Sequence, residues 1–155
     1  MPFVTPGGPA TTVCGRRPCA AVVEVNPANG AFEVKKLTVA MDLGTVVNPD
    51  GVKAQIEGST LWGMSLALFE QAPLKGGALQ VSNFGDYTPL RMSEMPELDI
   101  SIIANNDPPS GCGEPAVTVV APAIANAIFN AVGVRVRSLP ITQAEVRKGL
   151  QAKKT

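Results

Sequence analysis

The stretch Pro109-Ser-Gly-Cys-Gly-Glu-Pro115 connects a predicted strand to a predicted helix, and its turn decides how the second half of the chain folds. Gly111 and Gly113 allow the backbone to approach a bulky group closely, and Pro115 fixes the direction in which the chain leaves the loop. Glu114 is thereby held on a glycine-hinged loop, where a carboxylate can serve as a base in a cleft. An ordinary surface turn that carries an acid is the alternative, because turns rich in glycine and proline are common.

Hydrophobic periodicity and turn signals predict a mixture of strands and helices around this loop. Strands are expected over 20–25, 31–41, 97–104 and 134–141, a further hairpin over 70–73 and 78–81, and helices over 50–69, over 122–132 with Gly133 as C-cap, and after the capping residue Thr142. The elements follow no regular βαβ repeat, so the predicted class is α+β, with hairpins of a mixed sheet packed against about three helices. Residues 1–19 are expected to be an irregular lead-in to a single domain over 20–155.

The composition limits the classes of partner. Of the 155 residues, 45% are hydrophobic, and 13 basic side chains balance 13 acidic ones, so the formal net charge is zero. A neutral chain with scattered basic residues is not expected to bind nucleic acid or an anionic membrane surface. No apolar run approaches the roughly 18 residues that a membrane-spanning helix needs. One ordinary soluble globular domain is therefore the expected class.

The three cysteines, Cys14, Cys19 and Cys112, cannot form a complete set of disulfides, which favours a reducing compartment or free thiols. Cys14 and Cys19 have the spacing that opens a plant-type iron–sulfur motif, but Val22 stands where the third cysteine is needed. The chain also contains no histidine. We therefore expect no metal site built from the side chains of this chain alone.

Several motifs occur along the chain in an order typical of one family. They are Asp42-Leu-Gly-Thr-Val-Val-Asn-Pro-Asp50, Gln55-Ile-Glu-Gly58 with Gly63, Ser82-Asn-Phe-Gly-Asp-Tyr87, Met95-Pro-Glu97, Gly111-Cys-Gly-Glu-Pro115 and Ala121-Pro-Ala-Ile-Ala-Asn-Ala-Ile-Phe129. Over residues 22–142 the chain resembles the C-terminal segment of the molybdenum-binding subunit of the xanthine dehydrogenase/aldehyde oxidase family. Large subunits of the bacterial isoquinoline 1-oxidoreductase type are the most similar branch, whereas residues 1–19 do not match the family pattern.

The resemblance implies an oxidoreductase that hydroxylates a carbon beside a ring nitrogen, or an aldehyde carbon, with water as the source of oxygen. Glu114 matches the family's base, which takes up a proton as the oxygen attacks the substrate carbon. Gln55 matches a glutamine on the segment that approaches the pterin cofactor, where an amide can both donate and accept hydrogen bonds. The alternatives are a structural turn acid for Glu114 and a solvent-facing helix residue for Gln55.

Three glycines and a cysteine complete the site that the resemblance implies. Gly58, together with Gly63, would let its helix lie close to the cofactor, although close packing against another backbone explains both equally well. Gly111 and Gly113 would offer backbone N–H groups to the cofactor, with plain turn geometry as the alternative. Cys112 occupies a variable position of the loop and is interpreted as a small buried hydrophobic residue before a reactive thiol.

The family's molybdenum subunit is several times longer than this chain. The resemblance therefore implies that a molybdopterin-type molybdenum cofactor is bound only in an assembled complex, with none held by this chain alone. The implied partners are the remaining part of the molybdenum subunit, as a separate chain, and an iron–sulfur electron-transfer subunit, with a small molecule as substrate. An apolar face around residues 117–120 and the Gly58/Gly63 side of the helix is then expected to be exposed for a partner to cover.

Interpretations other than an active enzyme part stay open. A non-catalytic remnant or assembly module of the same fold predicts a well-covered monomer or a symmetric homo-oligomer, in which Glu114 has nothing to act on. A truncated reading frame would leave the same piece. A simple small-molecule binding protein is the third possibility. Free thiols favour the cytoplasm, whereas export with a partner would place a bacterial protein of this family in the periplasm.

Overall fold

A mixed four-stranded sheet forms the base of the molecule, for which the computed structural model describes residues 3–6 and 17–153. Its strand order is β1 (Phe3–Pro6), β2 (Cys19–Val25), β3 (Phe32–Gly44) and β6 (Glu97–Ala104). The first three are antiparallel neighbours, whereas β3 and β6 run parallel. Because parallel strands need a long crossover, the chain between them includes the helix α1 (Pro49–Leu68).

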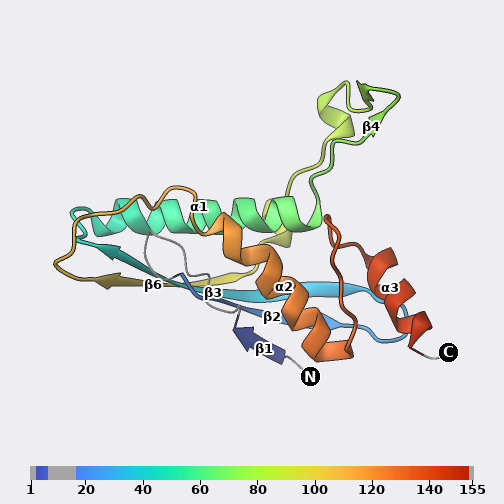
Figure 1. Cartoon of the computed structure of the whole chain (residues 1–155), viewed down its shortest axis with the longest axis horizontal. Helices are drawn as coiled ribbons and strands as arrows, with labels where there is room; N and C mark the ends of the chain where they lie inside the picture. The colour runs from blue at the N-terminus through green and yellow to red at the C-terminus, as the bar shows by residue number, and fades with distance from the viewer. Residues whose placement is uncertain (1–2, 7–16, 154–155) are drawn as a thin grey trace.

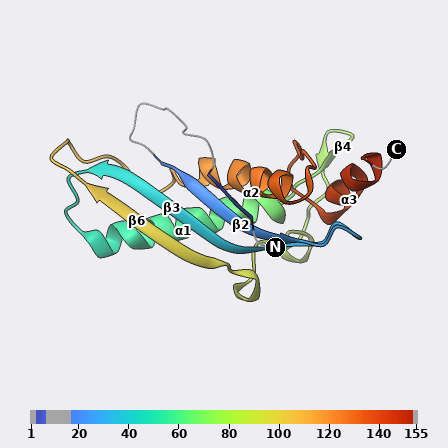
Figure 2. The same cartoon turned by 90° about the horizontal axis from the view of Figure 1, so that it is seen from below.

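Two helices, α1 and α2 (Val117–Val132), cover one face of this sheet. Figure 1 shows both helices over the strands, and Figure 2 shows the strands from the other side. The core lies between the two layers, and its largest fully buried side chains are Leu37, Met41, Ile56, Ile124 and Ile128. A third helix, α3 (Gln143–Ala152), contributes the fully buried Val146 at the end of the sheet. The predicted α+β class with three helices is confirmed.

Most predicted elements lie within a few residues of their expected bounds. The hairpin β2–β3, the long helix α1 and the strand β6 are all present. Gly133 caps α2 in the left-handed conformation, as predicted, with φ +68° and an N–H group that donates to Phe129 O. Thr142 caps α3 through its side-chain oxygen, which accepts a hydrogen bond from Glu145 N at 3.2 Å.

The helix α2 begins at Val117, earlier than the predicted start at Pro122. Proline favours the first turn of a helix, and inside a helix it costs about 3 kcal/mol because it removes a hydrogen bond. Val119 and Val120 are buried within the first turn, and burying two valines stabilises the helix by about 3 to 6 kcal/mol. Packing therefore offsets the cost of an internal proline.

Residues 134–141 are not a strand, so that prediction is wrong. Val134 and Val136 are buried while Arg135 is exposed, so the predicted alternation is real. Nevertheless, no strand pairs with this segment among the residues described. The guanidinium of Arg135 instead lies 3.6 Å from the ring centroid of Phe129 on α2. Alternation thus identifies an extended segment, and a strand additionally requires a partner for its backbone.

Residues 69–96, here called the arm, project from the body of the molecule near the end of α1 (Figure 1). A hairpin is present in the arm, but its ladder contains only β4 (Leu74–Lys75) and β5 (Ala78–Leu79). The predicted strand over 70–73 is therefore wrong, because the first strand begins at Leu74. The lead-in also differs from its prediction, because Phe3–Pro6 is a strand paired with β2. The rest of the lead-in through residue 16, with Cys14, lies outside the described residues.

Candidate functional site

The loop that carries Glu114 is tied to the end of β3. The backbone N–H of Ser110 donates to Leu43 O at 2.9 Å. Next to it, Gly44 has φ +73°, and a Cβ at this position would collide with the carbonyl oxygen of Pro108. Only glycine therefore allows strand and loop to pass so closely, and the loop's position is set by the sheet.

Glu114 lies at the entrance to α2. Its carbonyl oxygen accepts a hydrogen bond from Val117 N at 3.0 Å, so its backbone is part of the turn that starts the helix. Its side chain is exposed, and no side chain in the described part of the protein pairs with the carboxylate. A free carboxylate on a fixed backbone can take a proton from a molecule that binds beside it.

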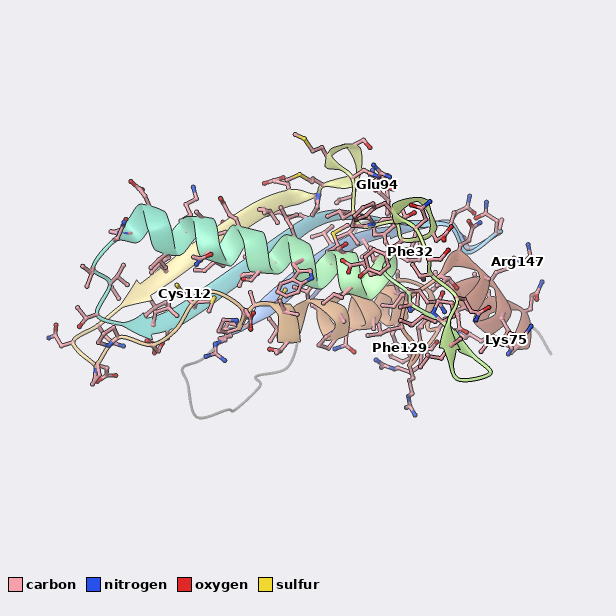
Figure 3. All side chains as sticks on the ribbon, turned by 90° about the horizontal axis from the view of Figure 1, so that it is seen from above. Phe32, Lys75, Glu94, Cys112, Phe129 and Arg147 are labelled. Atoms are coloured by element: carbon pink, nitrogen blue, oxygen red, sulfur yellow. The ribbon has the colours of Figure 1, made fainter. Side chains whose placement is uncertain are left out.

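A hollow of about 580 Å³ lies between the first turns of α1 and this loop. Its lining comes from the end of β3, from α1 and from the loop: Leu43, Thr45, Val46, Val47, Asn48, Gly51, Val52, Ala54, Gln55, Pro109, Ser110 and Cys112. Figure 3 shows Cys112 beside α1, on the side where the loop runs along the helix. Asn48 caps α1 at the hollow's rim by accepting a hydrogen bond from Gly51 N at 3.0 Å.

The structure brings most of the predicted site residues together. Gln55 and Cys112 both line the hollow, and a Cβ added to Gly113 would lie 3.8 Å from Gln55 Nε2. Glu114 follows Gly113 directly in the chain, and Gly58 lies one helical turn beyond Gln55 on the same side of α1. The structure does not bury Gln55 or Glu114, since both side chains are exposed.

The glycines of the candidate site are not required by the chain's own packing. A Cβ at Gly58 or Gly111 would have no atom of the described chain within 4 Å, and a Cβ at Gly113 would make only an ordinary contact. None of the three has a positive φ, so backbone conformation does not require glycine there either. Space is therefore open beside each of the three glycines in the described chain.

Gly63 is different, because a Cβ there would lie 3.0 Å from Val117 Cα and 3.1 Å from Val117 O. Close packing of α1 against α2 explains this glycine. The same contact makes one expectation wrong: Val119 and Val120 are 4% and 0% exposed and do not form an apolar face for a partner. Val120 packs against α1, because its Cγ2 atom lies 3.1 Å from the position of a Cβ at Gly63.

The two cysteines in the described region have different surroundings. Cys19 is buried in the core, and burial raises the pKa of its thiol to about 12, so the thiolate needed for reaction is scarce at neutral pH. Cys112 is half-buried and lines the hollow. Neither forms a disulfide within the described residues, and no three metal-ligating side chains gather there.

Sequence reasoning missed the polar rim of the hollow. Asn48 and Ser110 lie on it, and both come from motifs that were noticed for other reasons. The signal that could have identified Asn48 is the sequence Asn48-Pro49, which is typical of a helix N-cap followed by the first helical residue. Ser110 gave no comparable signal, because its position depends on the contact with Leu43.

Comparison with known proteins identifies the family of this fold and site. Residues 6–96 match a family described as the molybdopterin cofactor-binding domain. The chain belongs to this family of molybdopterin cofactor-binding domains, as the sequence motifs predicted. In the described part of the chain, no helix combines the length and the apolar character needed to cross a membrane.

Two curated relatives are similar over most of this chain. It is 50% identical over 133 residues to a membrane-bound aldehyde dehydrogenase [pyrroloquinoline-quinone] from Gluconacetobacter polyoxogenes, which covers 86% of this chain and 17% of the relative. It is 38% identical over 122 residues to isoquinoline 1-oxidoreductase subunit beta from Brevundimonas diminuta, which covers 79% of this chain and 16% of the relative. The chain thus spans about one sixth of the length of these relatives.

Solved structures share the fold. The aldehyde oxidoreductase from Desulfovibrio gigas superposes with a TM-score of 0.77 at 29% identity, which covers 88% of this chain and 15% of that one. Quinoline 2-oxidoreductase from Pseudomonas putida 86 gives a TM-score of 0.80 at 24% identity, with 88% and 19% covered. The second likeness concerns the fold alone.

Proposed function

We propose that this chain is one part of a molybdenum hydroxylase, in which Glu114 acts as the base. The observation that carries the proposal is the meeting of two distant segments at one hollow: α1 contributes Gln55, and the loop contributes Cys112, which Gly113 and Glu114 follow directly in the chain. Family membership supports the cofactor class. An amide, a small thiol, open backbone and a free carboxylate are the groups that a polar cofactor and a proton transfer require.

The residues present fit one edge of a molybdopterin-type cofactor. Gly58, Gly111 and Gly113 leave space that no described part of the chain fills, and Gln55 is exposed beside it. When bound, the cofactor supplies the redox centre that accepts the two electrons removed from the substrate carbon. Gln55 would orient it by donating and accepting hydrogen bonds, and the loop's backbone N–H groups would add further donors.

Glu114 would take up the proton that is released as oxygen derived from water attacks the substrate carbon. Its backbone is fixed by the turn into α2 and by the loop's attachment to β3, so the position of this residue beside the hollow is defined. The substrate would be an N-heterocycle or an aldehyde. The names of the relatives include isoquinoline, nicotinate and aldehyde enzymes, so both classes stay in the proposal.

The remaining cofactor contacts would come from a partner that carries the rest of the molybdenum subunit, and electrons would leave through an iron–sulfur subunit. Support comes from the open side of the hollow, which the described chain leaves unfilled. Molybdenum content and native mass should be measured for the chain alone and after co-expression with the proteins encoded beside its gene. We expect molybdenum only in the larger complex; a chain that stays free of molybdenum with every partner would support the assembly-module alternative.

A second candidate is a component of a quinone-dependent aldehyde dehydrogenase. It rests on the name of the Gluconacetobacter polyoxogenes relative, which includes pyrroloquinoline-quinone. The family match favours the molybdenum cofactor instead. The same purified complex separates the two, because metal analysis detects molybdenum, and extraction with absorption spectroscopy detects a quinone.

A further inference from the structure

The arm exposes large apolar side chains. Phe84 is 99% exposed, Met92 89%, Leu74 72% and Leu79 61%. They belong to the hairpin and to the two short helical turns that follow it, Phe84–Asp86 and Met92–Glu94. Leaving such side chains in water is unfavourable by about 1.5 to 3 kcal/mol each relative to full burial. An apolar surface of this kind on a projecting segment is typical of an interaction site.

Acidic side chains of the arm accept hydrogen bonds from backbone N–H groups of the arm. The carboxylate of Asp86 accepts hydrogen bonds from the backbone N–H groups of Ser82 and Asn83, both at 3.1 Å, and these bonds lower its pKa. Glu94 accepts a hydrogen bond from Arg91 N at 2.8 Å. The acids thus stabilise the turns, while the apolar side chains face outward. This arrangement suits an apolar and largely uncharged partner surface.

The arm has little to hold it together. Its ladder contains two residues on each strand, whereas an isolated hairpin needs further packing to be stable in water. Its attachments to the body include the hydrogen bond from Leu90 N to Ser65 Oγ of α1 at 2.9 Å, and Tyr87 donates to Glu70 near its base. Leu90 itself packs against the core, and no residue between 71 and 89 is buried.

We propose that the arm docks into an apolar surface of the polypeptide that carries the rest of the molybdenum subunit. This inference rests on the proposed function and names the contact through which the partner is held. The family match over residues 6–96 includes the whole arm, so the arm belongs to the domain that relatives carry within much longer chains. In those relatives about five sixths of the chain lies outside the matched segment and can supply the surface.

The test uses the full chain co-expressed with the proteins encoded beside its gene, and it measures how tightly they bind the chain and its variants. Phe84→Asp and Leu79→Asp place a charge in the proposed contact. Leu139→Asp is the matched control, because Leu139 is 62% exposed, against 61% for Leu79, and lies outside the arm. We expect a one-to-one complex with the unchanged chain, which Phe84→Asp weakens about 30-fold or more and Leu139→Asp leaves unchanged.

Thermal unfolding of each isolated variant serves as the folding control, and exposed positions should leave the midpoint unchanged. A complex that binds the arm variants as tightly as the unchanged chain would overturn the docking proposal and leave the proposed function standing. Failure of the unchanged chain to bind would overturn both. A second copy of this chain is the alternative partner for the arm, and sedimentation of the chain alone tests it. A homodimer that Phe84→Asp dissociates would assign the arm to that contact.

Discussion

The two sides of α1 have opposite surroundings, although each carries a glycine that costs helix stability. At Gly63 the helix touches the backbone of α2 so closely that a methyl group would have to displace Val117. At Gly58 the helix faces open space, beside Gln55 and the loop of Glu114. The first side is completed by the chain itself. The second is left open by the described part of the chain.

The comparison explains why packing alone does not account for the candidate site. A glycine inside a helix costs about 1 kcal/mol relative to alanine, and the contact between α1 and α2 offsets that cost at Gly63. No such contact offsets it at Gly58, nor does a turn conformation account for Gly111 or Gly113. A bound cofactor would give all three the same explanation.

The largest effect is expected on the open side. In the assembled complex, Glu114→Gln should lower turnover at least about 100-fold, because an amide cannot accept the proton. Assembly and molybdenum content should not change, since the side chain is exposed and makes no contact within the described chain. Glu57→Gln on α1 is the control, as Glu57 has only a 3.9 Å surface ion pair with Lys53. Steady-state rates measure the turnover of both variants. Retained turnover in Glu114→Gln would contradict the role of Glu114 as the base.

On the closed side, Gly63→Ala should destabilise the isolated chain by about 1 to 2 kcal/mol. The added methyl group meets backbone atoms of Val117, and such overpacking costs more than the gain in helix propensity returns. Urea unfolding followed by circular dichroism gives the free energy. Equal or greater stability of the variant would show that the two helices can separate without cost.

The same substitution at Gly58 should act in the opposite direction. Gly58→Ala is expected to stabilise the isolated chain by up to about 1 kcal/mol, because the methyl group enters open space in a helix. In the assembled complex it should reduce the molybdenum retained per chain, since the space is then partly filled. If retention were unaffected, Gly58 would drop out of the proposed cofactor contact.

The smallest change to the molecule is a chemical label on a thiol. In a Cys14→Ser background at pH 7.5, iodoacetamide should modify Cys112 and leave Cys19 unmodified until the chain unfolds, because Cys19 is buried with a pKa near 12. Mass spectrometry of digested protein locates the label. Protection of Cys112 in the molybdenum-loaded complex would support its place beside the cofactor, and equal labelling in both states would place the cofactor elsewhere.

Local patterns predicted the elements that carry a clear signal in their own sequence. The strand β6, the long helix α1 and the caps at Gly133 and Thr142 follow from periodicity and from single residues at defined positions. The start of α2 was mispredicted because the burial of Val120 against α1 outweighs the proline signal. Such burial depends on contacts between distant residues, which periodicity does not contain.

The sequence predicted which residues belong to the candidate site but not how they are arranged in space. The resemblance named Gln55 and the loop of Glu114, and the structure places these two segments at one hollow. The exposure of both side chains and the polar rim at Asn48 were not foreseen, because they depend on how β3, α1 and the loop come together. The projecting arm was read only as a hairpin and a loop, since a sequence does not indicate what a segment packs against.

The parallel pairing of β3 with β6 has a consequence for the order of assembly. Both strands end at the same edge of the sheet, so the segments after them, which lead to Gln55 and to Glu114, leave the sheet side by side. Pairing these strands joins residues about 60 positions apart, which makes it a slow, long-range step of folding. Once it is complete, the two halves of the site are already aligned.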